Sequence, residues 1–220
     1  MDQSLDFIEI KPKSQSKAKK LMIFLHGYGT NKNNLAALSF EFVQTLPDCH
    51  FISLNAPFKY ELASIKRQKD VYQWFSATLP RQLTIQQVDQ SSKILGQFID
   101  DQLKRLNLSD ENLILCGFSQ GAMMSIYHAT RRPKPINSVI AIAGRIVDED
   151  DFQPTSKPPI CLIHGTNDLV VPFSRHVQAQ EILNKHHYPY QEFTINDYPH
   201  LIGKKTIEVA NNFLLKNDQH

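Results

Sequence analysis

Residues 113–121 read LILCGFSQG, and this stretch decides the fold. Its first four residues are apolar, as in a strand that is buried on both faces. The next five have the pattern Gly-x-Ser-x-Gly, and the helix-forming run 122–130 follows directly. A strand, a sharp turn centred on Ser119 and a helix form the context in which this pattern presents a nucleophilic serine. We expect side chains at positions 117 and 121 to collide, so that glycine is required at both.

Further short apolar runs indicate a sheet around this central strand. They lie at 21–25, 51–54, 139–143, 160–163 and 190–195. Helical patterns separate them: Thr84 and Gln87 have the spacing of a capping box before a stripe that ends at Leu106, and another stripe runs from Thr206 to Leu214. The alternation predicts an α/β fold, a mostly parallel doubly wound sheet of about seven strands without a separate lid domain. We expect residues 1–220 to form a single domain.

Composition excludes several classes of protein. The chain has 220 residues, 41% of them hydrophobic, and a net charge of +2. So small a charge favours neither nucleic acid nor anionic lipid as a partner. Five lysines within residues 11–20 predict a solvated loop between two strands, although a nucleic-acid patch is the alternative. No apolar run is long enough to span a membrane, and three cysteines without paired spacing are typical of a cytoplasmic protein.

A serine nucleophile needs a histidine base and a carboxylate that orients it. After Ser119, acidic residues follow strand ends at 148–151, at Asp168 and at Asp197. The acidic run predicts a solvated loop, and Asp168, placed between a glycine turn and an apolar patch, is the preferred acid. His200 follows the last strand, so it is the histidine expected to reach Ser119 from the same sheet edge. His26 and His164 are expected to orient turns, and no metal site is predicted.

Acyl transfer also requires backbone N–H groups that bind the oxyanion. The residue after the nucleophile, Gln120, is expected to supply one of them. Tyr28, in the turn His26-Gly27-Tyr28-Gly29, is expected to supply the other. The segment 55–83 shows no periodicity and is rich in aromatic residues, which either border an acyl pocket or pack onto the domain. Trp74 is the best pocket candidate there.

In motif order the chain resembles the phospholipase/carboxylesterase family of α/β-hydrolases, which includes acyl-protein thioesterases, and it looks most like a bacterial esterase branch. The resemblance rests on the turn at 26–29, on Gln73-Trp74-Phe75, on the motif at 117–121, on His164-Gly165-x-x-Asp168 and on His200. It implies a serine esterase or thioesterase that needs no cofactor and acts on a small-molecule acyl ester or thioester, as a monomer or homodimer. Acyl-protein thioesterase or lysophospholipase activity is an alternative. Leu201, where relatives usually have a small residue, is a further pocket candidate. A hydrolase-like protein that binds acyl groups without turnover is the rival hypothesis.

Overall fold

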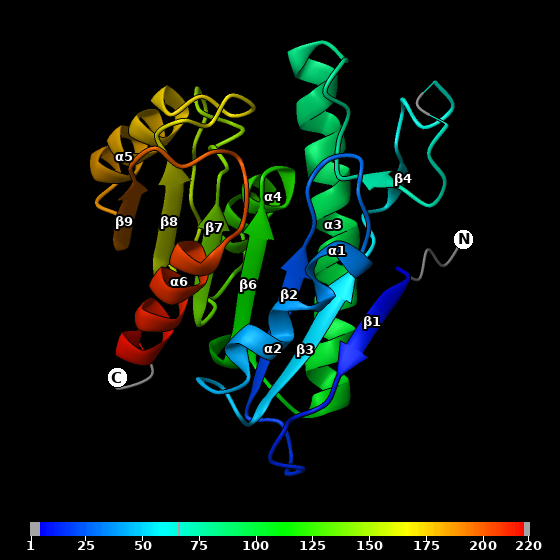
Figure 1. Cartoon of the computed structure of the whole chain (residues 1–220), viewed down its shortest axis with the longest axis vertical. Helices are drawn as coiled ribbons and strands as arrows, with labels where there is room; N and C mark the ends of the chain where they lie inside the picture. Colours follow the sequence, from blue (N-terminus) through cyan, green and yellow to red (C-terminus); the bar gives the residue numbers. More distant parts are fainter. Residues whose placement is uncertain (1–4, 66, 218–220) are drawn as a thin grey trace.

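A seven-stranded sheet forms the centre of the computed structural model, which describes residues 5–65 and 67–217 (Figure 1). The strands stand in the order β1-β3-β2-β6-β7-β8-β9. β1 pairs antiparallel with β3, and every other pair in this sheet is parallel. The predicted α/β fold is therefore confirmed. The strand bounds are β1 Phe7–Ile10, β2 Lys20–Leu25, β3 Cys49–Leu54, β6 Leu113–Phe118, β7 Ser138–Ile142, β8 Ile160–Gly165 and β9 Tyr190–Ile195.

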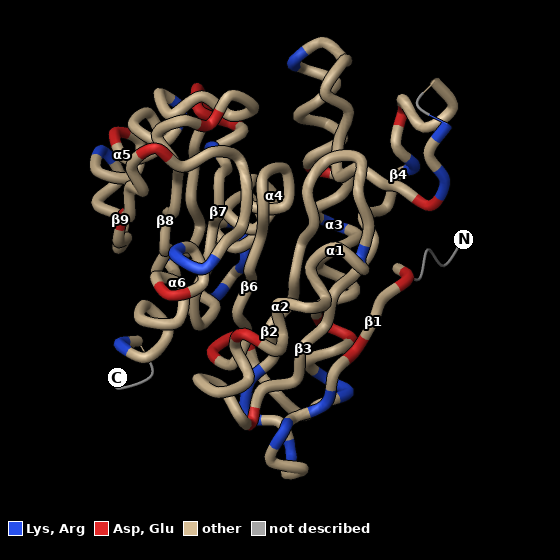
Figure 2. The backbone as a smooth tube through the Cα atoms, in the orientation of Figure 1, with Lys and Arg blue, Asp and Glu red and all other residues tan. Residues whose placement is uncertain are grey.

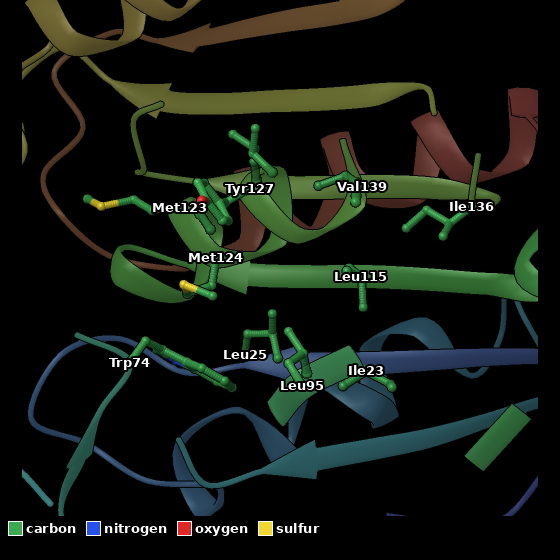
Figure 3. Close-up of a cluster of buried hydrophobic side chains, with 14 of the residues drawn as sticks. Ile23, Leu25, Trp74, Leu95, Leu115, Met123, Met124, Tyr127, Ile136 and Val139 are labelled. Atoms are coloured by element: carbon green, nitrogen blue, oxygen red, sulfur yellow. The ribbon is translucent and has the colours of Figure 1, made fainter. Parts of the chain in front are cut away.

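Helices cover both faces of the sheet, because successive side chains of the buried strands point to opposite sides. One apolar core joins alternate strand residues to α3 Arg81–Leu106, α4 Gln120–Ala129 and α5 Ser174–Lys185. The second core joins the remaining strand residues to α1 Asn33–Ala36, α2 Leu38–Phe42 and α6 Lys204–Asn217. Figure 3 shows part of the first core, where Leu25 and Leu115 of the sheet face Leu95 of α3 and Met124 of α4. The stripe predicted near the C-terminus is the buried face of α6.

The aperiodic segment 55–83 contains a small hairpin apart from the main sheet. Its strands are β4 Phe58–Lys59 and β5 Tyr72–Gln73, and an isolated bridge links Tyr72 to Thr30. The hairpin therefore ties this segment to the loop that follows β2. A short 3-10 turn, η1 Asp110–Asn112, precedes β6.

The capping box expected at Thr84 is wrong. α3 begins three residues earlier, at Arg81, with Pro80 before its first turn. Proline suits a helix start because its ring fixes φ near the required value and its missing N–H is not needed there. The Thr84 hydroxyl donates to the carbonyl of Leu79 at 3.2 Å, and the Gln87 side-chain oxygen accepts the N–H of Ser76 at 2.7 Å. Both side chains therefore stabilise the segment that leads into the helix.

The lysine-rich stretch forms the connection between β1 and β2, as predicted, and its side chains lie largely in solvent. Lys19 pairs with Asp48 at 2.6 Å. Figure 2 shows basic and acidic positions interspersed along the described chain. The three cysteines lie buried and unpaired in strands β3, β6 and β8. No helix in the described ranges is long and apolar enough to cross a membrane.

Candidate active site

Ser119 lies on a strained turn between β6 and α4. Its φ of 55° and ψ of −117° place it in a region that residues other than glycine rarely adopt. The turn is held by the Ser119 N–H, which donates to the carbonyl of Ile142 in β7 at 2.8 Å. The residue is 8% exposed, and it contributes to the lining of a surface cavity at the carboxyl ends of the strands. Ser119 therefore lies on the sharp turn, or elbow, between a strand and a helix that residues 113–121 predict.

Two glycines make this turn possible. A β-carbon on Gly117 would lie 2.2 Å from the carbonyl oxygen of Gly121. One on Gly121 would lie 1.8 Å from the carbonyl oxygen of Leu25 in β2. Real β-carbons do not approach backbone atoms so closely, so any other residue would force the strand and helix apart. The steric prediction from the Gly-x-Ser-x-Gly pattern is thereby confirmed.

Asp168 and His200 meet at the same edge of the sheet. The Asp168 side chain is fully buried, and its Oδ2 lies 2.6 Å from Nδ1 of His200. Its Oδ1 accepts the N–H groups of Val170 and Val171 at 2.9 and 2.8 Å. The acid is thus fixed by its own turn and directed at the imidazole. A histidine that donates from Nδ1 to a carboxylate presents Nε2 as an acceptor, which is the form that a general base requires.

The imidazole of His200 also packs beside the elbow. Its ring centroid lies 4.8 Å from that of Phe118, the residue before Ser119. The loop after β9 therefore brings His200 next to the turn that carries Ser119, as its place in the chain predicts. Asp197, the alternative acid on that loop, is exposed, and its N–H binds the Thr166 hydroxyl at 2.9 Å.

His26 and His164 orient loops, as expected. The Nε2 of His26 accepts the N–H of Ala56 at 3.0 Å, and burial lowers its pKa to about 4. The Nε2 of His164 donates to the carbonyl of Val171 at 2.9 Å and lies 3.3 Å from Asp168 Oδ2. Burial also lowers the pKa of His164. Both rings are therefore neutral, and their hydrogen bonds hold the turns around the site in place.

The two predicted oxyanion residues both contribute to the lining of the cavity. Gln120 is the first residue of α4, where a backbone N–H has no acceptor within the helix. Its side chain accepts the N–H of Trp74 at 2.8 Å and donates to the carbonyl of Phe75 at 2.7 Å. The Tyr28 hydroxyl donates to Glu61, and burial followed by the Glu61 charge raises the pKa of that hydroxyl. Side-chain contacts thus fix both positions to the segment 60–78.

The cavity beside Ser119 has a volume of about 460 Å³ and a lining of mixed character. Aliphatic and aromatic side chains make up one part of it, and three arginines make up another. The lining residues are Tyr28, Phe75, Ser76, Ala77, Leu79, Arg81, Thr84, Ile85, Ser119, Gln120, Met123, Arg145, Val147, Val170, Val171, Pro172 and Arg175. Such a volume suits a small organic group.

Neither pocket candidate from the sequence is among the described residues that line this cavity. Trp74 is fully buried, and its indole N–H donates to the carbonyl of His26 at 2.9 Å, so it packs against the turn at residues 26–29, within the core shown in Figure 3. A buried indole N–H needs such an acceptor, which directs the ring inward. Its neighbour Phe75 lines the cavity instead. Leu201 is 41% exposed and is not among the described residues that line the cavity.

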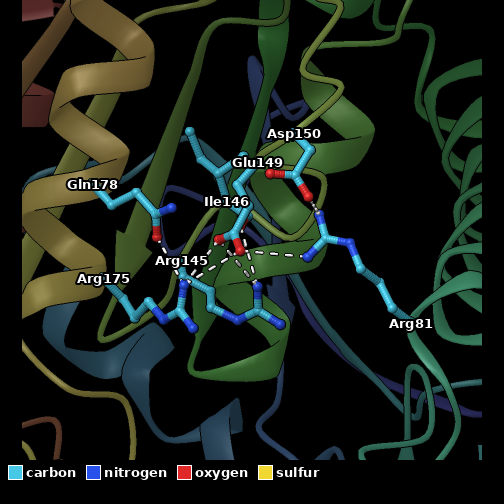
Figure 4. Close-up of polar contacts among 7 residues, drawn as sticks. All are labelled: Arg81, Arg145, Ile146, Glu149, Asp150, Arg175 and Gln178. Carbon is cyan, nitrogen blue, oxygen red and sulfur yellow. Dashed lines mark hydrogen bonds and ion pairs between the residues drawn. The ribbon is translucent and has the colours of Figure 1, made fainter.

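The acidic run at 148–151 is more than the solvated loop that we predicted. Asp148 is buried and binds Arg131. Glu149 is 12% exposed and lies within reach of Arg81, Arg145 and Arg175 (Figure 4). Arg145 is four residues before Glu149, whereas Arg81 and Arg175 come from distant segments that no local motif connects to it. The sequence therefore offers no signal for the cluster as a whole.

Glu61 is a second residue that sequence reasoning missed. Its carboxylate accepts hydrogen bonds from the hydroxyls of Tyr28, Ser76 and Thr78 and from the N–H of Ala77. These bonds lower the pKa of Glu61 against the opposing effect of its burial. Glu61 therefore joins the turn that carries Tyr28 to the cavity wall.

The phospholipase/carboxylesterase family profile matches residues 6–218. The chain belongs to this family. It is 27% identical over 207 residues to acyl-protein thioesterase 1 of Kluyveromyces lactis, and the alignment covers 88% of this chain and 86% of the relative. It is 25% identical over 194 residues to esterase YpfH of Escherichia coli, and that alignment covers 88% of this chain and 81% of the relative. The crystal structure of esterase PE8 superposes with a TM-score of 0.88 at 29% identity, over 96% of this chain and 98% of that one.

Family membership makes the chain an α/β-hydrolase that acts on esters or thioesters. The resemblance inferred from the motifs is therefore confirmed. In the described ranges, no group of three or more His, Cys, Asp or Glu side chains is placed to hold a metal ion.

Proposed function

We propose that the protein is a serine hydrolase that cleaves small carboxylic esters or thioesters through an acyl-enzyme on Ser119. The observation that carries the proposal is the 2.6 Å hydrogen bond between Asp168 and His200, beside a serine in a strained elbow. An oriented imidazole next to a nucleophile turn is the arrangement that activates a hydroxyl group. A protein that only bound acyl groups would not need this buried, oriented pair.

The reaction follows from these positions. His200 Nε2 takes the proton of the Ser119 hydroxyl as its oxygen attacks the acyl carbon, and Asp168 stabilises the imidazolium. The backbone N–H groups of Tyr28 and Gln120 bind the oxyanion that forms. When the intermediate collapses, the imidazolium gives its proton to the departing alkoxide or thiolate. Water then attacks the acyl-serine, transferring a proton to His200, and the acid leaves with Ser119 restored.

Support for a small substrate comes from the cavity. Its volume of about 460 Å³ and its apolar residues, among them Met123, Val147 and Val171, suit a short acyl group. The relatives named esterase and acyl-protein thioesterase support chemistry at an acyl carbon bonded to oxygen or sulfur. We therefore place short acyl esters first and the corresponding thioesters second.

The test is a kinetic comparison on 4-nitrophenyl butyrate and on the S-butyryl ester of N-acetylcysteamine. Ser119→Ala should lower kcat/KM at least about 10³-fold on both substrates, because the substitution removes the hydroxyl group that attacks the acyl carbon. Ser125→Ala is the matched control: this buried serine of α4 donates to the carbonyl of Gly121 at 2.9 Å and lies outside the cavity lining. It should retain activity within a few-fold. A Ser119→Ala protein that kept more than a tenth of the wild-type rate would overturn the proposal.

A further inference from the structure

Three arginines of the cavity wall surround one carboxylate. Arg81 is the first residue of α3, Arg145 lies on the loop after β7, and Arg175 is near the start of α5. All three line the cavity that contains Ser119. Figure 4 shows their guanidinium groups turned towards Glu149. Residues far apart in the chain thus concentrate positive charge at one side of the cavity.

Glu149 does not saturate these donors. Its oxygens lie 3.4 Å from Arg81 Nη1, 3.6 Å from Arg145 Nη1 and 3.2 Å from Arg175 Nη1. Well-formed bonds between guanidinium and carboxylate groups measure about 2.7–2.9 Å. Among the described residues, the polar contacts of the Arg145 guanidinium, to Glu149 and to the carbonyl of Ile146, are made by Nη1 alone. Arginine carries five N–H donors in a planar fork, so donors remain for a further anion.

The local charge is positive as well. Asp150 joins the cluster through a 2.7 Å contact with Arg81 Nη2, so three guanidinium groups face two carboxylates. The pKa of Arg145 is lowered, chiefly by burial and also by the positive charges of Arg175 and Arg81. The negative charge of Glu149 opposes this shift. A further carboxylate placed here would therefore relieve repulsion among the arginines.

The cluster lies close to the nucleophile turn. A β-carbon on Gly144, the residue before Arg145, would lie 3.3 Å from the carbonyl oxygen of Ser119 and 2.7 Å from the β-carbon of Ala122. The backbone that carries Arg145 is thus packed directly on the elbow. Met123 and Val147 line the same cavity and provide an apolar surface for methylene groups. A short chain attached to Ser119 would meet both kinds of surface.

The acyl part of the substrate is the part that enters this cavity. In the proposed reaction His200 protonates the leaving group, so the leaving group must lie at the imidazole. His200 is not among the described residues that line the cavity. The space beside the arginines therefore remains for the acyl chain.

We propose that Arg81, Arg145 and Arg175 bind a carboxylate at the far end of the acyl chain, so that half-esters of short dicarboxylic acids are the preferred substrates. This inference rests on the proposed function. Glu149 shows that these three side chains accommodate a carboxylate, and phosphate is the alternative anion that the test separates from it. The bound carboxylate would approach the N–H groups of the Arg145 guanidinium that do not contact Glu149 or Ile146.

The experiment compares monoethyl adipate with ethyl hexanoate, which match in acyl length and differ in the terminal charge. Release of acid is followed in a pH-stat, and the readout is the ratio of the two kcat/KM values within each protein, which cancels any loss of folded enzyme. Wild type should prefer the half-ester at least tenfold, and Arg145→Gln should lower this ratio at least tenfold. Arg105→Gln, at the opposite end of α3 and paired with Glu9, is the control and should leave the ratio unchanged.

Free adipate and inorganic phosphate, compared as competitive inhibitors at equal ionic strength, identify the anion. Adipate should inhibit wild type more strongly than phosphate and should inhibit Arg145→Gln more weakly than wild type. Stronger inhibition by phosphate, no wild-type preference for the half-ester, or an unchanged ratio in Arg145→Gln would each overturn the inference. Failure of the proposed function is a separate result, because it would be seen as hydrolysis of both substrates by Ser119→Ala.

Discussion

The elbow at residues 117–121 and the cavity wall formed by 76–81, 145–150 and 170–175 border one cavity, but different contacts hold them in place. Backbone atoms in van der Waals contact determine the elbow, and only glycine fits at Gly117 and Gly121. Side-chain hydrogen bonds and ion pairs between distant segments determine the wall, with Glu61 and Glu149 at their centres. The turn that carries Ser119 is thus fixed by backbone packing, whereas the cavity wall, to which we assign substrate choice, depends on side chains that a few substitutions can change.

The largest expected effect is at the elbow. Gly121→Ala places a β-carbon 1.8 Å from the carbonyl oxygen of Leu25, which forces β2 and α4 apart. We expect the melting temperature to fall by at least about 10 °C, or the protein to be insoluble. Gly27→Ala is the control, because its β-carbon would meet the nearest atom at an ordinary 3.4 Å. Equal melting temperatures for the two variants, measured by circular dichroism, would refute the steric account.

The elbow was predictable from sequence because its constraint is local. Residues 113–121 contain the strand, the turn and both glycines, and strand order then places Asp168 and His200 at the same edge. The wall was not predictable in the same way. Trp74 was expected at the cavity, but its N–H binds the carbonyl of His26 and turns the ring into the core. The acidic run was expected in solvent, because Arg131, which binds Asp148, and Arg81 and Arg175, which reach Glu149, lie in other segments of the chain.

A second prediction separates the elbow from the groups that activate it. Asp168→Asn should lower kcat about 10³–10⁴-fold while the fold persists, because the imidazole loses the partner that orients its Nδ1 proton. Asp197→Asn, an exposed aspartate on the loop before His200, is the control and should leave kcat within twofold. Equal kcat values for the two variants on 4-nitrophenyl butyrate would show that Asp168 is not the acid.

In the wall, Glu61→Gln removes the charge that accepts four hydrogen bonds from the segment 76–78 and Tyr28. We expect a loss of stability on the order of 1–2 kcal/mol and a drop of about tenfold in kcat/KM, since the turn that carries Tyr28 loses its anchor. Urea unfolding and ester kinetics measure the two effects. Glu208→Gln, on the exposed side of α6, should change neither quantity, and the same behaviour in Glu61→Gln would exclude this anchoring role.

Acidic pH should lower the stability of the fold that carries both the elbow and the cavity wall. Burial lowers the pKa of His128 in α4 to about 3, from an ordinary value of 6.5. Between these values the unfolded chain binds a proton that the folded protein does not, so stability falls as the pH falls from about 6.5 towards 3. His128→Asn should reduce this slope by up to about 1.4 kcal/mol per pH unit in urea unfolding between pH 6.5 and 4. Exposed His187→Asn is the control, and a slope unchanged in both variants would contradict the prediction.

The smallest effect is expected at Leu201. Because this side chain is 41% exposed and outside the described cavity lining, Leu201→Ser should change kcat/KM on 4-nitrophenyl butyrate by less than about threefold. Phe75→Ser, one residue after Trp74 and within the lining, is the contrasting variant and should lower kcat/KM by more. A larger loss of kcat/KM in Leu201→Ser would show that Leu201 contacts the substrate.

The account depends most directly on the identity of the nucleophile. The wild-type protein should be incubated with an alkyl fluorophosphonate, and its mass should be measured by intact-protein mass spectrometry. Proteolytic digestion and peptide mapping then locate the adduct. We predict one adduct per chain, on Ser119, with loss of esterase activity in proportion to labelling. Adduct on another residue, or complete labelling of Ser119 with ester hydrolysis undiminished, would contradict the account.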